Sequence, residues 1–81
     1  MGWEERIELR PDVLVGKPIV KGTRISVEFV IELMADGWSE ATILQEYPFL
    51  TRDDILACLN YASERLQSEK IYLRPRKEPA A

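Results

Sequence analysis

One short pattern occurs three times between residues 25 and 55, and it constrains the fold more than any other feature of the chain. Each copy places an apolar residue before a hydroxyl residue, with a second apolar residue four positions after the hydroxyl. The three copies are Ile25-Ser26 with Val30, Trp38-Ser39 with Ile43, and Leu50-Thr51 with Ile55. A hydroxyl in this position caps the free N–H groups of a helix, and the apolar pair packs across the cap. Three helices are therefore predicted to begin here.

The first helix is predicted over residues 27–35. Its apolar residues recur at the spacing of one helical face, which comprises Val27, Val30, Ile31 and Met34. Asp36-Gly37 follows, and Gly37 is expected to end the helix in a left-handed conformation. The second helix is predicted over residues 40–47, because Pro48 cannot continue it. Its inner side is expected to comprise Ala41, Leu44 and Tyr47.

The third helix is predicted to start after Thr51 and to continue to about Glu69. Its start is the most strongly marked, because Thr51 and Asp54 have the spacing of a capping box. A buried stripe is expected along it, formed by Ile55, Leu59, Ala62 and Leu66 with Leu56 and Cys58 beside them. The connections at 36–38 and 48–50 are short, so consecutive helices should pack as neighbours.

A short helix, a turn and a longer helix are typical of a helix-turn-helix inside a three-helix unit. The fold class predicted for residues 26–69 is therefore mainly α, with the first 25 residues forming a short β arm. Many small three-helix units bind no nucleic acid, so a purely structural packing unit stays open as an alternative.

The β arm is predicted from two extended segments. Residues 6–9 alternate polar and apolar side chains, and Gly16 and Gly22 bracket a second extended piece that contains Pro18. Two strands this short are marginally stable alone. Pairing with the same arm of a second chain would stabilise them and cover an exposed edge, so a homodimer is predicted.

Composition argues against catalysis and for a small binding module. The chain has 81 residues, no histidine and a single cysteine, Cys58. It can form no internal disulfide, no histidine–cysteine metal site and no histidine-based catalytic triad. We expect no catalytic residue, no metal and no cofactor. No run is long and apolar enough to span a membrane, and the N-terminus is charged, so a cytoplasmic protein without a membrane partner is predicted.

The charge is unevenly distributed along the chain. Residues 1–25 carry five basic and four acidic groups, residues 26–69 two basic and nine acidic, and residues 70–81 four basic and one acidic. The net charges are thus +1, −7 and +3, which give the total of −3. Any nucleic-acid footprint must therefore come from the ends of the chain, not from the helices.

Four basic residues are candidates for nucleic-acid contact. Lys17, Lys21 and Arg24 form the densest basic cluster and can contact phosphates. They can instead stay solvated at the rim of the domain or form ion pairs with the acidic helices. Arg52, at the start of the third helix, is in the position from which a recognition helix reads bases. The adjacent Asp53 and Asp54 oppose that role and are explained more simply as capping residues. The segment from Gly16 to Thr23 lacks the lysine that a phosphate-binding loop requires.

The last twelve residues are a candidate partner-binding tail. They begin with an apolar segment and continue with basic and proline residues, which predicts a partly disordered segment that orders on binding. The residues expected to contact a partner are Ile71, Tyr72, Leu73, Arg74 and Arg76.

The sequence also resembles a known prokaryotic family. The segment from Gly16 to Val27, followed by Gly37-Trp38-Ser39, Tyr47-Pro48 and the segment from Leu50 to Ile55, is similar to the domain of unknown function 433 family, over roughly residues 5–66. The resemblance implies a homeodomain-like three-helix fold with an N-terminal β extension, often dimeric. It also implies an antitoxin of a toxin–antitoxin pair, which masks a PIN-like ribonuclease and binds its own operator DNA.

The sequence leaves three functions open. The first is an antitoxin-like adaptor for a PIN-like ribonuclease that also binds operator DNA as a dimer. The second is a DNA-binding transcriptional regulator with no toxin, and the third is a structural dimerisation module. The acidic helices favour the first, because a charge of −7 can complement the basic surface of a nuclease.

Overall fold

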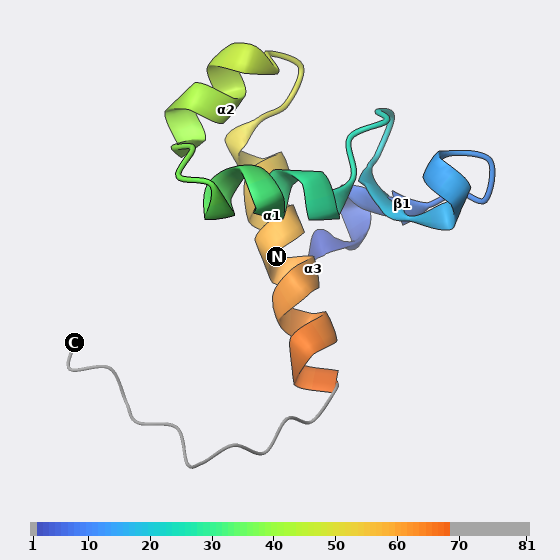
Figure 1. The fold of residues 1–81 in the computed structure, drawn as a ribbon. Helices are drawn as coiled ribbons and strands as arrows, with labels where there is room; N and C mark the ends of the chain where they lie inside the picture. The colour runs from blue at the N-terminus through green and yellow to red at the C-terminus, as the bar shows by residue number, and fades with distance from the viewer. Residues whose placement is uncertain (1, 69–81) are drawn as a thin grey trace, which may run out of the picture.

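The structure is a computed structural model, and it describes residues 2–68. In this part of the chain, three α-helices follow a two-stranded antiparallel hairpin (Figure 1). The strands are β1 (Ile7–Leu9) and β2 (Pro18–Val20), and the helices are α1 (Val27–Ala35), α2 (Glu40–Glu46) and α3 (Arg52–Ser68). Two single-turn 3-10 helices, η1 (Trp3–Glu5) and η2 (Leu14–Gly16), precede the two strands. The prediction of a mainly α fold with an N-terminal β arm is confirmed.

The three predicted helix starts are confirmed by their hydrogen bonds. In each helix the hydroxyl residue before the first turn accepts a backbone N–H three positions later; the pairs are Ser26 with Phe29 at 2.9 Å, Ser39 with Thr42 at 3.1 Å, and Thr51 with Asp54 at 3.2 Å. At α3 the box is reciprocal, because the Thr51 amide donates to Asp54 Oδ2 at 2.9 Å. Each start is therefore fixed by local chemistry.

The end of α1 follows the predicted glycine cap. Gly37 has φ +97°, and its amide donates to the Met34 carbonyl at 3.0 Å. The Trp38 amide reaches back to the Leu33 carbonyl, also at 3.0 Å. These two bonds satisfy carbonyls that the end of a helix leaves free. The turn sends the chain directly into α2, so α1 and α2 are neighbours.

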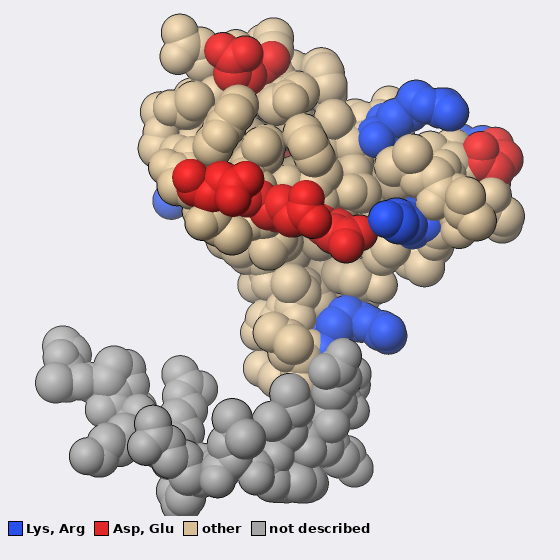
Figure 2. Space-filling view, viewed as in Figure 1, with Lys and Arg blue, Asp and Glu red and all other residues tan. Residues whose placement is uncertain are grey.

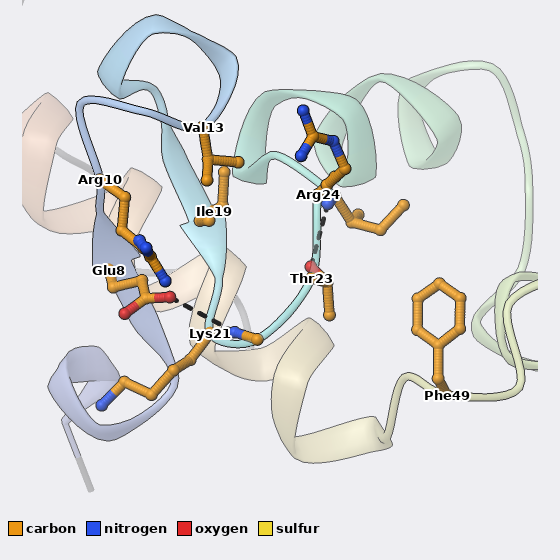
Figure 3. A pocket seen from close by; sticks show the side chains of 10 residues that line it. Glu8, Arg10, Val13, Ile19, Lys21, Thr23, Arg24 and Phe49 are labelled. Carbon is orange, nitrogen blue, oxygen red and sulfur yellow. Dashed lines mark hydrogen bonds between the residues drawn. The ribbon is translucent and has the colours of Figure 1, made fainter.

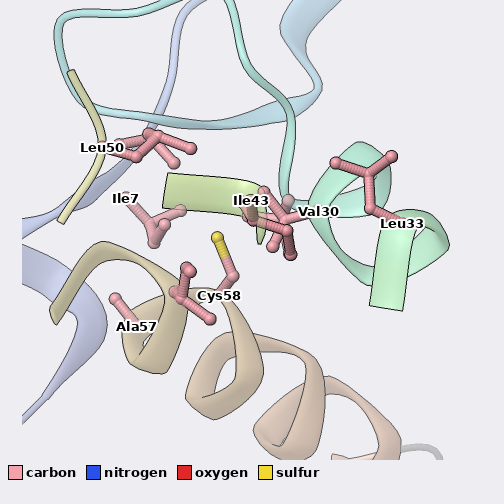
Figure 4. Close-up of a cluster of buried hydrophobic side chains, with 10 residues drawn as sticks. Ile7, Val30, Leu33, Ile43, Leu50, Ala57 and Cys58 are labelled. Atoms are coloured by element: carbon pink, nitrogen blue, oxygen red, sulfur yellow. The ribbon is translucent and has the colours of Figure 1, made fainter. Parts of the chain in front are cut away.

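Every regular element contributes to one hydrophobic core (Figure 4). Its buried members include Ile7 and Val20 from the hairpin, Val27, Val30 and Leu33 from α1, Ile43 from α2, Leu50, and Ile55, Ala57 and Cys58 from α3. Figure 4 shows the Cys58 thiol pointing from α3 toward Ile43. The core thus lies where α1, α2 and the hairpin meet the first half of α3.

Two expectations about buried faces are wrong. Leu59 and Leu66, predicted to be in the buried stripe of α3, are 38% and 58% exposed. Leu66 lies in the C-terminal half of α3, which projects beyond the other elements, so it has little to pack against (Figure 1). Leu59 lies nearer the core, but the covered face of α3 runs through Ile55, Cys58 and the half-buried Tyr61, and Leu59 is beside that face. On α2, Ala41 is exposed and Ile43 is fully buried. Helical periodicity defines a face, but it does not show which part of that face another element covers.

The hairpin is stabilised within a single chain. Its register pairs Ile7 with Val20, Glu8 with Ile19 and Leu9 with Pro18. Ile7 and Val20 are buried in the core, and the preceding Trp3 packs edge-to-face on Tyr61 of α3, with ring centroids 4.8 Å apart. The sequence predicted that pairing with the same arm of a second chain would stabilise these strands. Within residues 2–68 the helices of the same chain already pack on the hairpin, and the homodimer stays a prediction.

Candidate binding surfaces

Two of the four predicted nucleic-acid residues form ion pairs with the acidic helices. Lys17, just before β2, places its Nζ 3.0 Å from Glu28 Oε1 of α1. Arg52, the first residue of α3, places its Nε 3.1 Å from Glu40 Oε2 of α2. Both pairs are exposed, so each contributes at most about 1 kcal/mol and opens readily. The Lys17 pair is the one expected if the basic cluster pairs with the acidic helices instead of with phosphates.

The start of α3 is neutralised by a residue that sequence reasoning missed. Arg6, next to β1, lies 3.1 Å from Asp54 Oδ1 and 3.5 Å from Asp53 Oδ2. Asp54 is 8% exposed and also caps α3. The carboxylates at this helix start are therefore occupied by a cap and a guanidinium. Arg6 is separated from Asp54 by 48 positions, so no local sequence signal indicated the contact.

The other two predicted residues, Lys21 and Arg24, lie together in the loop between β2 and α1. Among the described residues, neither side chain has an ion-pair partner, unlike Arg6, Arg10, Lys17 and Arg52. The loop itself is well fixed. The Thr23 hydroxyl donates to the Val20 carbonyl at 2.8 Å and accepts the Ile25 amide at 2.9 Å.

Lys21 and Arg24 line a shallow cavity of about 720 Å³ (Figure 3). Its other lining residues are Glu8, Arg10, Val13, Ile19, Gly22, Thr23, Ile25 and Phe49. Phe49 is 59% exposed, and it is the one aromatic residue among the exposed large hydrophobic residues of the described part of the chain. Figure 3 shows Thr23 and Arg24 between Phe49 on one side and Glu8 and Lys21 on the other.

A second hollow adjoins the first and shares Arg24 and Ile25 with it. Its remaining lining residues are Leu14, Ser26, Phe29 and Tyr47. The Tyr47 ring packs edge-to-face on Phe29 at 5.7 Å and on Phe49 at 6.3 Å, so three aromatic residues follow one another along this surface. We call the two hollows together the basic trough.

A surface of opposite charge runs along α1. Glu28, Glu32 and Asp36 are exposed and lie at successive intervals of four residues, which places them on one helical face. We call these three residues the acidic row. Figure 2 shows a row of acidic side chains over α1, with basic side chains at the end nearest the hairpin. Residues 26–68 carry eight acidic and two basic groups, a net charge of −6.

Two titratable groups have shifted pKa values. Burial, reinforced by the charge of Asp54, raises the pKa of the Cys58 thiol to about 12. The burial agrees with the prediction that Cys58 lies beside the buried stripe of the third helix, and a protonated buried sulfur is a poor nucleophile. On the exposed connection between the strands, a hydrogen bond from Arg10 lowers the pKa of Asp12 from its usual value. That contact at 3.1 Å occupies the Arg10 guanidinium.

Three further predictions concern the C-terminal tail, metal binding and the membrane. The predicted partner-binding residues Ile71, Tyr72, Leu73, Arg74 and Arg76 lie outside the described residues. Within residues 2–68, no group of three or more Cys, Asp or Glu side chains is arranged to hold a metal ion. None of the described helices combines the length and apolar character needed to cross a membrane.

Comparisons with known proteins place this surface chemistry in a family context. Residues 7–62 match the family described as "Protein of unknown function (DUF433)". The crystal structure of a DUF433 member protein from Anabaena variabilis ATCC 29413 is similar to this chain, with a TM-score of 0.73 and 27% sequence identity. The match covers 78% of this chain but only 62% of that one. No match was found among curated proteins.

Proposed function

This chain belongs to the DUF433 family of proteins of unknown function, and from its surface chemistry we propose that it is a cytoplasmic, non-catalytic adaptor of the antitoxin type. Its acidic helices bind a basic surface of a PIN-like ribonuclease and thereby mask the nuclease. The chain acts as a homodimer, and the tail that includes Arg74 and Arg76 adds contacts to the same partner.

The acidic row is the observation that carries this proposal. Glu28, Glu32 and Asp36 present carboxylates along one exposed face of α1, on a helical body with a net charge of −6. A surface that binds RNA is positively charged, so it is attracted to such a row, and the attraction speeds the encounter and selects the partner. Within residues 2–68, Glu28 is the one member of the row that forms an ion pair, and that pair with Lys17 is exposed. The row is therefore accessible to a partner at little energetic cost.

The residues that could carry chemistry support a non-catalytic role. The chain has no histidine, and its one cysteine is buried with a pKa of about 12. Histidine, the commonest general acid–base group, is therefore absent, and a buried protonated thiol is a poor nucleophile. The acidic row is a solvated helix face whose carboxylates act through charge.

The proposal is tested by purifying the tagged protein from its native cell after nuclease treatment and identifying the bound proteins by mass spectrometry. A PIN-like ribonuclease in stoichiometric amount is the expected result. Its affinity is then measured for the double variant Glu32→Lys, Asp36→Lys, which should bind at least tenfold more weakly, with the difference shrinking at high salt. The matched control is Glu4→Lys, Glu5→Lys, which reverses two exposed carboxylates outside the row.

Equal affinity of both double variants and the unmodified protein would remove the acidic row from the proposal. Recovery of the protein without any nuclease would count against the antitoxin role itself.

A homodimeric DNA-binding regulator is the second candidate, and it is favoured by the unpaired cations Lys21 and Arg24. It predicts an affinity for operator DNA that falls steeply with salt concentration and that is lost when these two charges are reversed. The carboxylates of Asp53 and Asp54 beside Arg52 weigh against base reading by the first turn of α3.

A further inference from the structure

The basic trough combines apolar surface with unpaired positive charge. Its two hollows meet at Arg24 and Ile25, and the exposed Phe49 ring borders the larger one. Folding normally covers a large aromatic side chain, because about 25 cal/mol is gained per Å² of apolar surface removed from water. Phe49 gains little of this within the chain. It is therefore available to contact an apolar group of a ligand.

The trough is also rigid before any ligand arrives. The Thr23 hydroxyl bonds to both sides of the loop, and Gly22 takes a φ of +79° that few other residues adopt. Tyr47 packs against Phe29 and Phe49 and so fixes the aromatic wall. A preformed site loses less entropy on binding than one that must be ordered.

The charge pattern limits what the ligand can be. Lys21 and Arg24 supply two cations without ion-pair partners in the described part of the chain, whereas the neighbouring helices carry a net charge of −6. A nucleic acid brings many phosphates and is bound through several cations at once. Here most of its phosphates would face acidic helices. A short segment with one or two carboxylates meets the cations and avoids that repulsion.

We propose that the basic trough binds a short, extended protein segment in which a carboxylate lies close to a large apolar side chain. The apolar side chain contacts Phe49 and Ile25, and the carboxylate pairs with Arg24, whose guanidinium points away from Glu8 and Lys21 (Figure 3). A guanidinium beside apolar surface suits this pairing, since it binds a carboxylate through two parallel hydrogen bonds. The site does not include the acidic row, so it stands independently of the nuclease proposal.

The test is selection from a phage-displayed random heptapeptide library on the immobilised full-length protein. The expected result is enrichment of sequences with Asp or Glu within two positions of Leu, Ile, Phe, Tyr or Trp. A fluorescein-labelled copy of the most enriched peptide is then titrated by fluorescence anisotropy. Arg24→Glu and Phe49→Ser should each weaken its binding at least tenfold. Both side chains are exposed, so neither change removes core packing, and circular dichroism verifies the fold.

Two matched variants serve as controls. Arg52→Glu reverses an exposed cation outside the trough, and Leu66→Ser removes an exposed apolar side chain of similar accessibility to Phe49. Both should bind the peptide as the unmodified protein does. The proposal is overturned if no acidic–apolar consensus emerges, or if binding is insensitive to Arg24→Glu and Phe49→Ser. Displacement of the peptide by a short deoxythymidine oligomer at lower concentration than by unlabelled peptide would overturn it in favour of a nucleic-acid site.

Discussion

Replacing Val15 by glycine should make this protein more stable, although most substitutions do the opposite. Val15 lies in η2 with φ 56° and ψ 39°, the left-handed region, and its side chain is 95% exposed. The left-handed conformation costs an L-residue about 1–2 kcal/mol, and a β-branched side chain is a clear outlier there. Glycine removes this strain. It also makes the unfolded chain more flexible, which lowers the free energy of unfolding by about 0.4–1 kcal/mol. Because Val15 buries almost nothing, the net gain is about 1 kcal/mol.

Urea unfolding monitored by circular dichroism measures this gain, and a thermal scan should show a rise of about 4–8 °C for a domain of this size. The matched control is Val13→Gly in the same loop. Val13 has an extended φ of −123° and is half-buried, so glycine relieves no strain there and should lower stability. A decrease in stability for Val15→Gly, or a shift of the same sign in both variants, would refute the argument from backbone strain.

Two further changes test the energetics of α3. Asp54→Ala removes both the reciprocal cap and the contact with Arg6, and should lower the free energy of unfolding by about 2–3 kcal/mol in a urea titration. Asp53→Ala, at the more exposed neighbour, should lower it by less than about 1 kcal/mol. Cys58 makes the stability of the protein depend on pH in the alkaline range. The pKa of its thiol is about 12 in the folded protein, above the ordinary value of 9.0 that applies to the unfolded chain. Between these two pH values the thiol of the unfolded chain loses its proton, whereas the thiol of the folded protein keeps it. Unfolding free energy should therefore fall by up to about 1.4 kcal/mol per pH unit above pH 9, and Cys58→Ala should show a shallower slope in denaturation curves measured across that range.

The helix boundaries were predictable because their determinants are local. A hydroxyl group bonds to an amide three residues away, and Gly37 takes its left-handed conformation regardless of what packs on it. The first helix therefore has the predicted bounds of 27–35, and the reciprocal bonds of Thr51 and Asp54 are those expected from their spacing. The family resemblance was also read from these local strings, and the match over residues 7–62 confirms it.

The candidate binding surfaces were predictable only in part. The basic cluster was identified from the sequence, but the structure divides it: Lys17 pairs with Glu28, while Lys21 and Arg24 stay unpaired among the described residues. The basic trough was not predicted, because Phe49 comes from the loop before α3 and approaches the loop between β2 and α1 only after folding. No spacing in the sequence indicates that contact.

The sequence by itself determined where the helices begin, where α1 ends and how charge is distributed along the chain, because capping, glycine turns and composition act over a few residues. Only the tertiary structure decided which apolar and charged side chains find partners. Leu66 continues the helical spacing of buried Ile55, yet it is exposed because α3 is longer than the body that covers it. Burial and ion pairing depend on distances across the whole fold, and those distances exist only once the hairpin has packed on α3.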